Sequence, residues 1–298
     1  MKKPKTSVIG SYPVEINLLK HIKGYFNQED VTWDKYIESS VKDMVESGID
    51  IVSDGQTRDS FVNIFTRKLK GCRIRDRTEI IGKVEYNSPI TIEDQKFVKT
   101  LIPKNKKLIG VITGPYTLTN SCDDQFYKDE KELAFDFAKA LGREAKLLQK
   151  YVDMIGIDEP FFSMGVPDYG IELIRTIIQN ISCPVRLHVC GNISNVIPYL
   201  LEMPVDILSH EFKASPKLFD SFKQYEVKKN ICLGSVRSDK SDIESVDEIV
   251  FHIKKGIEVF GDKIIQLAPD CGQRMLSRDV AFKKLKNLVK AGEIVYGW

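Results

Sequence analysis

Three short runs decide the fold of this 298-residue chain: Met154-Ile-Gly-Ile-Asp-Glu159, Val185-Arg-Leu-His-Val-Cys190 and Asp206-Ile-Leu-Ser-His-Glu211. Each is mainly apolar and is followed by a longer segment, as expected of buried parallel strands joined by helices. The same alternation extends outward in both directions. Strands are expected at Ser7–Pro13, Ile49–Gly55, Leu108–Gly114, Met154–Glu159, Val185–Cys190, Asp206–Glu211, Ile231–Arg237 and Lys263–Ala268.

Eight strand–helix units favour closure into a (β/α)8 barrel, which typically needs roughly 250 residues. Amphipathic segments between the strands predict helices, and one of them opens with the capping-box sequence Ser245-Val-Asp-Glu248. These helices are expected at Trp33–Ser47, Glu130–Tyr151, Ser245–Phe260 and Asp279–Ala291. The segment Arg73–Ile92 breaks the pattern and is expected to be an inserted β-hairpin. With no linker or repeat, residues 1–298 are interpreted as one domain.

Composition narrows the class of protein. The 44 basic and 42 acidic residues are spread along the chain, and no basic run is interleaved with aromatic residues, so nucleic acid is not an expected partner. No apolar stretch approaches the roughly 18–20 residues of a transmembrane helix, and none resembles a signal peptide. A cytoplasmic protein is therefore expected. Its six cysteines should be reduced, and any that cluster are candidate metal ligands.

Candidate metal ligands lie at three strand ends. His188 and Cys190 are two residues apart on one strand and should point the same way, Glu211 ends the next strand, and Cys271 follows the last. The carboxyl ends of barrel strands form the face on which such enzymes build their sites. One nitrogen, two sulfurs and one carboxylate oxygen suit tetrahedral zinc. The competing interpretations are an inward-facing core pair for His188 and Cys190, and His210 in place of Glu211.

The charge of this ligand set indicates its chemistry. Zinc with two thiolates and a carboxylate carries a formal charge of about −1. Such a centre is poorly suited to making hydroxide, which favours less anionic ligand sets. It is better suited to binding an incoming thiol as a thiolate, so sulfur alkylation is the predicted reaction class.

These residues resemble the C-terminal catalytic half of cobalamin-independent methionine synthase. The resemblance also rests on Ile9-Gly10-Ser11-Tyr12-Pro13, Thr113-Gly114-Pro115 and Gly156-Ile157-Asp158-Glu159-Pro160, and it covers nearly the whole chain. It implies that homocysteine is the methyl acceptor and that the four residues above are zinc ligands. It further implies that the Ile9–Ser11 backbone holds the carboxylate of homocysteine and that Asp158 holds its ammonium group. For Asp158, a helix-capping carboxylate is the alternative.

The chain departs from that family in four places. It lacks the extra N-terminal half of the full-length enzymes, and Asp54-Gly55-Gln56 replaces a His-Gly-Glu motif, so Gln56 would meet the ammonium group without a charge. Ser121 stands where a folate-stacking tryptophan is expected. Lys240 loosely matches a proton-handling histidine, although a solvated lysine is the simpler interpretation. The chain therefore resembles short, single-barrel methionine synthases, which implies a methylcorrinoid donor, either methylcobalamin or a corrinoid protein.

Other functions remain open from the sequence. A zinc-dependent alkyltransferase acting on another thiol, such as coenzyme M, would share the metal site, but Asp158 favours an acceptor with an ammonium group. A zinc hydrolase or deaminase would need a base such as Glu159 or Asp270. A metal-free barrel and a zinc-binding accessory protein without turnover are the remaining alternatives.

Overall fold

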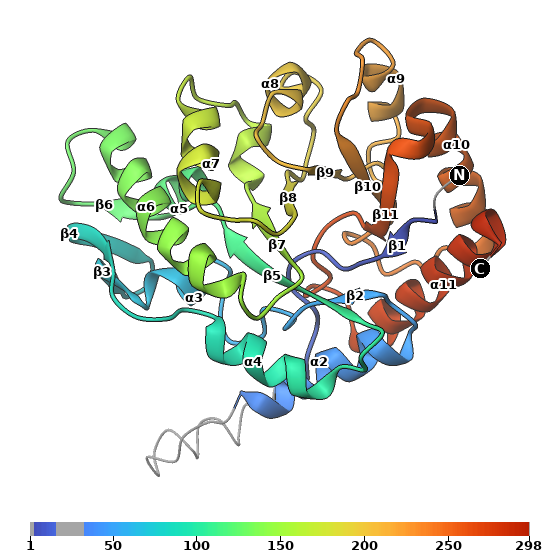
Figure 1. Cartoon of the computed structure of the whole chain (residues 1–298), viewed down its shortest axis with the longest axis horizontal. Coiled ribbons are helices and arrows are strands. Elements are labelled where there is room, and N and C mark those ends of the chain that lie inside the picture. The colour runs from blue at the N-terminus through green and yellow to red at the C-terminus, as the bar shows by residue number, and fades with distance from the viewer. Residues whose placement is uncertain (1–2, 16–32, 298) are drawn as a thin grey trace.

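The computed structural model describes residues 3–15 and 33–297, and it shows a closed parallel barrel (Figure 1). Eight strands form the sheet in the order β1-β11-β10-β9-β8-β7-β5-β2. A parallel bridge between Ser7 and Ile51 joins its two ends. The strands are β1 Lys5–Thr6, β2 Ile51–Val52, β5 Lys107–Thr113, β7 Met154–Asp158, β8 Val185–His188, β9 Ile207–His210, β10 Asn230–Val236 and β11 Ile264–Pro269.

Helices follow the strands and surround the barrel, so the predicted (β/α)8 fold is confirmed (Figure 1). The helix predicted from the capping box begins as expected, with the Ser245 hydroxyl and the Glu248 carboxylate each accepting a backbone N–H. The helices are α2 Asp34–Glu46, α3 Asn63–Thr66, α4 Ile92–Leu101, α5 Pro115–Ser121, α6 Glu130–Leu148, η1 Pro160–Ser163, α7 Gly170–Ile178, α8 Ile197–Leu201, α9 Leu218–Phe222, α10 Val246–Phe260, η2 Gly261–Lys263 and α11 Arg278–Tyr296.

Several strands are shorter than the apolar runs that predicted them. The first run was expected to be extended over Ser7–Pro13, but β1 ends at Thr6, and Gly10 has a φ of +48°, which is the left-handed region that favours glycine. Likewise β8 ends at His188, just before Cys190. The runs continue past the ladder because their apolar residues also build the loops at the carboxyl end of the barrel.

The inserted hairpin is present beside the barrel, where it packs on α6 (Figure 1). Its strands are β3 Leu69–Ile74 and β4 Thr78–Tyr86, and the two-residue strand β6 Asp123–Asp124 extends the sheet. The hairpin starts before Arg73 and ends before Ile92, where α4 begins. Gly82 is not at the turn. It lies beside Gly71, which has a φ of +77° and sits at a register shift, and a side chain on Gly71 would meet the backbone of Gly82 and Lys83.

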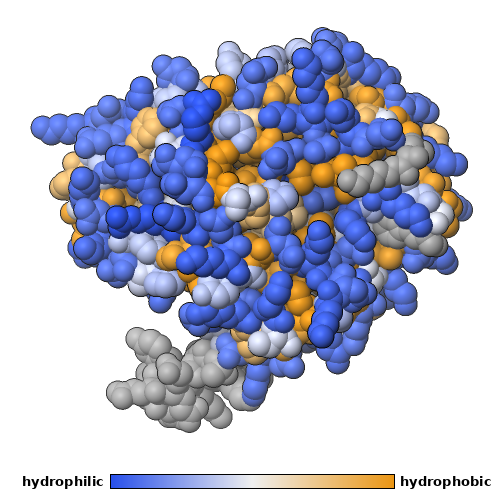
Figure 2. Space-filling view, in the orientation of Figure 1, coloured by the Kyte–Doolittle hydropathy of each residue, from blue (hydrophilic) through white to orange (hydrophobic). Residues whose placement is uncertain are grey.

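Two apolar cores hold the barrel. The larger lies between the sheet and the surrounding helices. The smaller fills the barrel interior and includes Ile51, Ile109, Met154, Ile207 and Cys232. The face seen in Figure 2 is correspondingly dominated by hydrophilic residues. Within the described residues, no helix is both long and apolar enough to cross a bilayer.

Candidate metal centre

The carboxyl end of the barrel brings together three of the four predicted metal ligands. Ligand atoms of His188, Cys190 and Cys271 all lie within 4.8 Å of one another. His188 is the last residue of β8, Cys190 follows it after one residue, and Cys271 lies two residues beyond β11. Strands distant in the sequence thus place one imidazole and two thiols around one point.

The environment of His188 suits a ring nitrogen that donates an electron pair to a metal ion. Its ring is 2% exposed, its Nδ1 lies 3.2 Å from the Ser209 hydroxyl, and its Nε2 is buried without a hydrogen-bond partner among the described residues. Burial, followed by the charge of Arg186, lowers the pKa of His188 well below its usual value, so the ring is neutral. A neutral imidazole with one nitrogen oriented by a hydroxyl and the other unpartnered beside two thiols fits a zinc ion.

The Cys271 thiol lies between Cys190 and the predicted carboxylate ligand. The hydrogen bond that Cys271 donates to Cys190, followed by burial, raises the pKa of the Cys271 thiol well above its usual value. Glu211 lies outside the group of atoms within 4.8 Å, but its side chain hydrogen-bonds Cys271, and its Oε2 accepts the Gly191 N–H at 2.8 Å. Glu211 is therefore beside the three ligands and partly engaged by backbone, as expected of a ligand that can leave.

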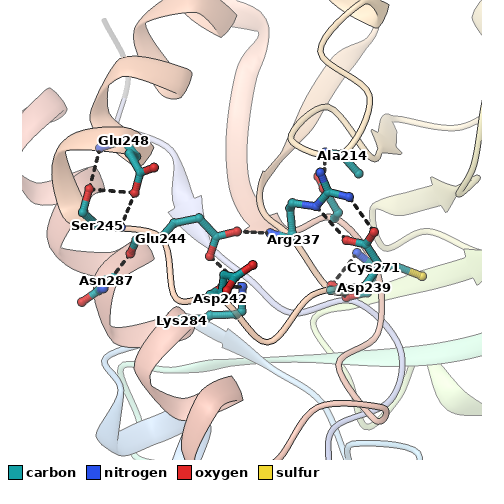
Figure 3. A network of polar contacts seen from close by, with 12 residues as sticks. Ala214, Arg237, Asp239, Asp242, Glu244, Ser245, Glu248, Cys271, Lys284 and Asn287 are labelled. Atoms are coloured by element: carbon teal, nitrogen blue, oxygen red, sulfur yellow. Dashed lines mark hydrogen bonds and ion pairs between the residues drawn. The ribbon is translucent and has the colours of Figure 1, made fainter.

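A polar network holds the loop that carries Cys271 (Figure 3). The Ser238 hydroxyl donates to the Cys271 carbonyl at 2.7 Å and accepts the Cys271 N–H at 3.1 Å. The neighbouring Arg237 N–H donates to Glu244 at 2.7 Å, and the other oxygen of Glu244 accepts a bond of 2.7 Å from the buried Lys284 on α11. The loop after β10 thus connects a candidate metal ligand to the last helix.

Two buried polar side chains, Asp158 and Gln56, lie next to the candidate metal ligands. The atoms Asp158 Oδ1 and Gln56 Nε2 are buried without hydrogen-bond partners among the described residues. A methyl group on Gly10 would lie 3.3 Å from Asp158 Oδ2 and 3.4 Å from Gln56 Oε1, so the glycine borders both side chains. Burial raises the pKa of Asp158 to about 7, and the Arg186 guanidinium opposes that rise. The orphaned oxygen of Asp158 fits a ligand with a cationic donor, and the orphaned amide nitrogen of Gln56 fits a ligand with an acceptor such as a carboxylate.

Other nominated residues lie elsewhere or are otherwise occupied. The Glu159 carboxylate, rather than Asp158, caps a helix, since it accepts N–H groups at the start of α5. Asp270 accepts two N–H groups from the loop after β9. His210 faces Phe212 and Phe222, and its Nδ1 bonds the Val189 carbonyl. Lys240 is exposed on the loop after β10.

The residues that support the candidate ligands, Ser209, Ser238 and Arg186, carry little signal in the sequence. Arg186 is the exception, since it stands two residues before His188 inside an apolar run, which is an unusual place for a charge. Ser209 is two residues after the apolar Ile207, so its inward orientation follows from strand alternation. The contacts of Ser238 depend on tertiary structure and have no local signal.

Comparison with known proteins gives a family match. Residues 4–294 match the family described as the catalytic domain of cobalamin-independent synthase. The methionine synthase of Methanocaldococcus jannaschii is 38% identical over 97% of this chain and 99% of its own length. That of Methanothermobacter marburgensis is 35% identical over 96% of this chain and 98% of its own length.

Among solved structures, a B12-independent methionine synthase from Shewanella sp. W3-18-1, in complex with selenomethionine, superposes with a TM-score of 0.84. It is 26% identical, and the match covers 99% of this chain and 98% of that protein. These findings do not support the methylcorrinoid donor and the corrinoid partner that were expected from the sequence, since both the family and this relative are described as independent of cobalamin.

Proposed function

The chain belongs to the family of cobalamin-independent synthase catalytic domains, and on that premise we propose that it makes methionine by methylating the sulfur of homocysteine at a zinc ion. It is a methyltransferase, as its methionine synthase relatives are. The proposed ligands are His188, Cys190, Glu211 and Cys271. The observation that carries this assignment is the buried, unpartnered Nε2 of His188 beside two thiols.

The ligand set suits a thiol substrate. When bound, zinc supplies positive charge that lowers the pKa of a coordinated thiol, so that the sulfur reacts as a thiolate near neutral pH. His188 contributes a neutral donor whose ring is fixed by Ser209. Glu211 would be the fourth residue to hold the metal, and the Gly191 N–H would keep its carboxylate in place if an incoming sulfur took that position.

The buried polar side chains beside the candidate metal ligands suit the amino-acid end of homocysteine. Asp158 would accept hydrogen bonds from the ammonium group, with Gln56 contributing its carbonyl oxygen. The backbone of Ile9–Ser11 would bind the carboxylate, and Gly10 keeps this segment close to Asp158 and Gln56 because it has no side chain. An acceptor without an ammonium group, such as coenzyme M, would leave the Asp158 carboxylate unpaired in a buried site.

The reaction then needs only positioning. The thiol proton would leave to solvent, and the sulfur would attack the methyl carbon of the donor. The new S–C bond forms while the bond to the donor breaks, and its electron pair stays with the donor. Holding the nucleophile in a fixed orientation is the main contribution of the protein to the rate.

The test is methionine formation by zinc-loaded protein with homocysteine and a methyl donor, followed by mass spectrometry. Cys271→Ala should lose zinc and activity together. Cys183→Ala is the matched control, because Cys183 is a half-buried cysteine that precedes β8, at the opposite end of that strand from His188, and it should keep both. Wild-type protein that holds zinc and forms no methionine with any donor would exclude the proposal.

The same assay identifies the methyl donor. Parallel reactions contain methyltetrahydrofolate, alone or with a polyglutamate tail, or methylcobalamin, and coenzyme M replaces homocysteine in a further set. Methionine with a folate donor alone would show that the half-buried Ser121 on α5 does not prevent folate from binding. Faster methylation of coenzyme M than of homocysteine would refute the role given to Asp158.

A further inference from the structure

Arg186 is a cation enclosed in the barrel interior. It is fully buried, and its hydrogen bonds go to neutral groups on other strands. Nη1 donates to the Ser7 hydroxyl at 2.9 Å and to the side-chain oxygen of Gln266 at 3.0 Å, and Nη2 donates to the Val8 carbonyl at 2.8 Å. Nε has no partner, and within the described ranges no carboxylate oxygen lies within ion-pair distance of the guanidinium.

Such a charge is unusual, because removing a guanidinium from water is costly unless an anion lies nearby. The partners of Arg186 accept hydrogen bonds from Nη1 and Nη2 but bring no negative charge to the guanidinium. A neutral side chain such as glutamine could make comparable bonds to Ser7 and Gln266. The charge itself therefore needs an explanation.

The position of Arg186 supplies one. It precedes His188 by two residues on β8, so both side chains point into the barrel and Arg186 lies one layer below the metal ligands. Above it are the groups that bring negative charge to the site: Cys190, Cys271, Glu211 and Asp158. Asp158 pairs with His188 across β7 and β8, whereas Gly156, which has no side chain, pairs with Arg186, so the Asp158 carboxylate lies one layer above Arg186.

We propose that Arg186 is a positioning residue whose charge favours the thiolate of homocysteine over the neutral thioether of methionine. The inference rests on the proposed function. Homocysteine releases its thiol proton to solvent on binding and brings a negative sulfur to the site. Methyl transfer removes that charge, so the attraction to Arg186 is lost in the product. Arg186 thus distinguishes substrate from product by the charge on the sulfur, an atom that both molecules contain.

Strand geometry gives the expected size of the effect of Arg186 on the ratio of dissociation constants. Two residues along a strand span about 6.6 Å. Unit charges at roughly that separation in an effective dielectric of about 20 interact strongly enough to change a binding ratio on the order of 10- to 100-fold. Methionine and homocysteine share their ammonium and carboxylate groups, so the ratio of their dissociation constants isolates the contribution of the sulfur.

Two variants test the charge: one removes it, and the other neutralises it. Arg186→Gln deletes it, whereas Gln266→Glu keeps Arg186 and places a carboxylate where the Gln266 oxygen now accepts its hydrogen bond. Both should reduce the preference for homocysteine over methionine roughly 10- to 100-fold, as measured by calorimetry on zinc-loaded protein. Arg186→Lys, which keeps the charge, should stay within about threefold of wild type. Gln266→Met is the control that removes a neutral partner, and it should leave the ratio unchanged.

A wild-type ratio in whichever of Arg186→Gln and Gln266→Glu folds and holds zinc would overturn the inference. So would an equal loss of preference in Gln266→Met, because that would assign the effect to packing. Failure of the proposed function has a different signature: zinc-loaded wild-type protein would bind neither homocysteine nor methionine.

Discussion

Replacing Ser238 with alanine tests whether the loop after β10 sets the geometry of the metal ligands. The Ser238 hydroxyl bonds both the N–H and the C=O of Cys271, and Ser238 is only 8% exposed. Alanine leaves both backbone groups without their present partner, at a cost of about 1 kcal/mol for each lost bond. We therefore expect zinc-free Ser238→Ala to lose about 2 kcal/mol of unfolding free energy. Because Cys271 is then less constrained, its affinity for zinc should fall roughly 10- to 100-fold.

Zinc dissociation constants from competition with a chelator, together with chemical denaturation of the zinc-free protein, measure the two effects separately. Ser235→Ala is the matched control: Ser235 is a fully buried serine on β10 whose hydroxyl donates to the Leu233 carbonyl at 3.0 Å. It should lose about 1 kcal/mol of stability and keep its zinc affinity. Equal zinc affinities in the two variants would refute the role given to Ser238.

Three further predictions concern charge. Gln56→Glu should leave zinc bound and tighten homocysteine about fivefold, because a carboxylate makes a charge-assisted bond to the ammonium group; calorimetry showing weaker binding would contradict this. Lys284→Met should cost ~3–5 kcal/mol in denaturation experiments because it leaves the buried Glu244 unpaired, and adding Glu244→Gln should restore much of that loss. Since the pKa of Cys271 is raised, its proton must leave when zinc binds, so affinity should rise up to about tenfold per pH unit for each proton released, and a pH-independent affinity would count against thiolate ligation.

Local sequence patterns were sufficient for the barrel because parallel strands in a covered sheet are apolar on both faces. Their ends were less predictable. A strand ends where its neighbour's backbone stops pairing, and nothing local marks this at Thr6 or His188. The hairpin shows a second limit: it begins at Leu69, before the predicted Arg73, and its turn lies at the charged residues 75–77, where no glycine marks it.

At the site, strand alternation and the carboxyl-end rule were enough to nominate His188, Cys190 and Cys271. The position of Glu211 beside the other three depends on the turn at Gly191, whose N–H holds its carboxylate. The buried charge of Arg186 could be read from the sequence, but its lack of a carboxylate partner could not. That property depends on which side chains the other strands direct to the same layer.

The junction at which the barrel closes has a consequence for ligand binding. Strands β1 and β2 have two residues each and meet through the bridge between Ser7 and Ile51. The segment after β1 contains Gly10, and the loop after β2 contains Gln56, so a bound amino acid would touch both sides of the seam. Bound homocysteine should therefore stabilise the closure between β1 and β2. The amides of Ser7 and Ile51 should then exchange with deuterium more slowly when homocysteine is present.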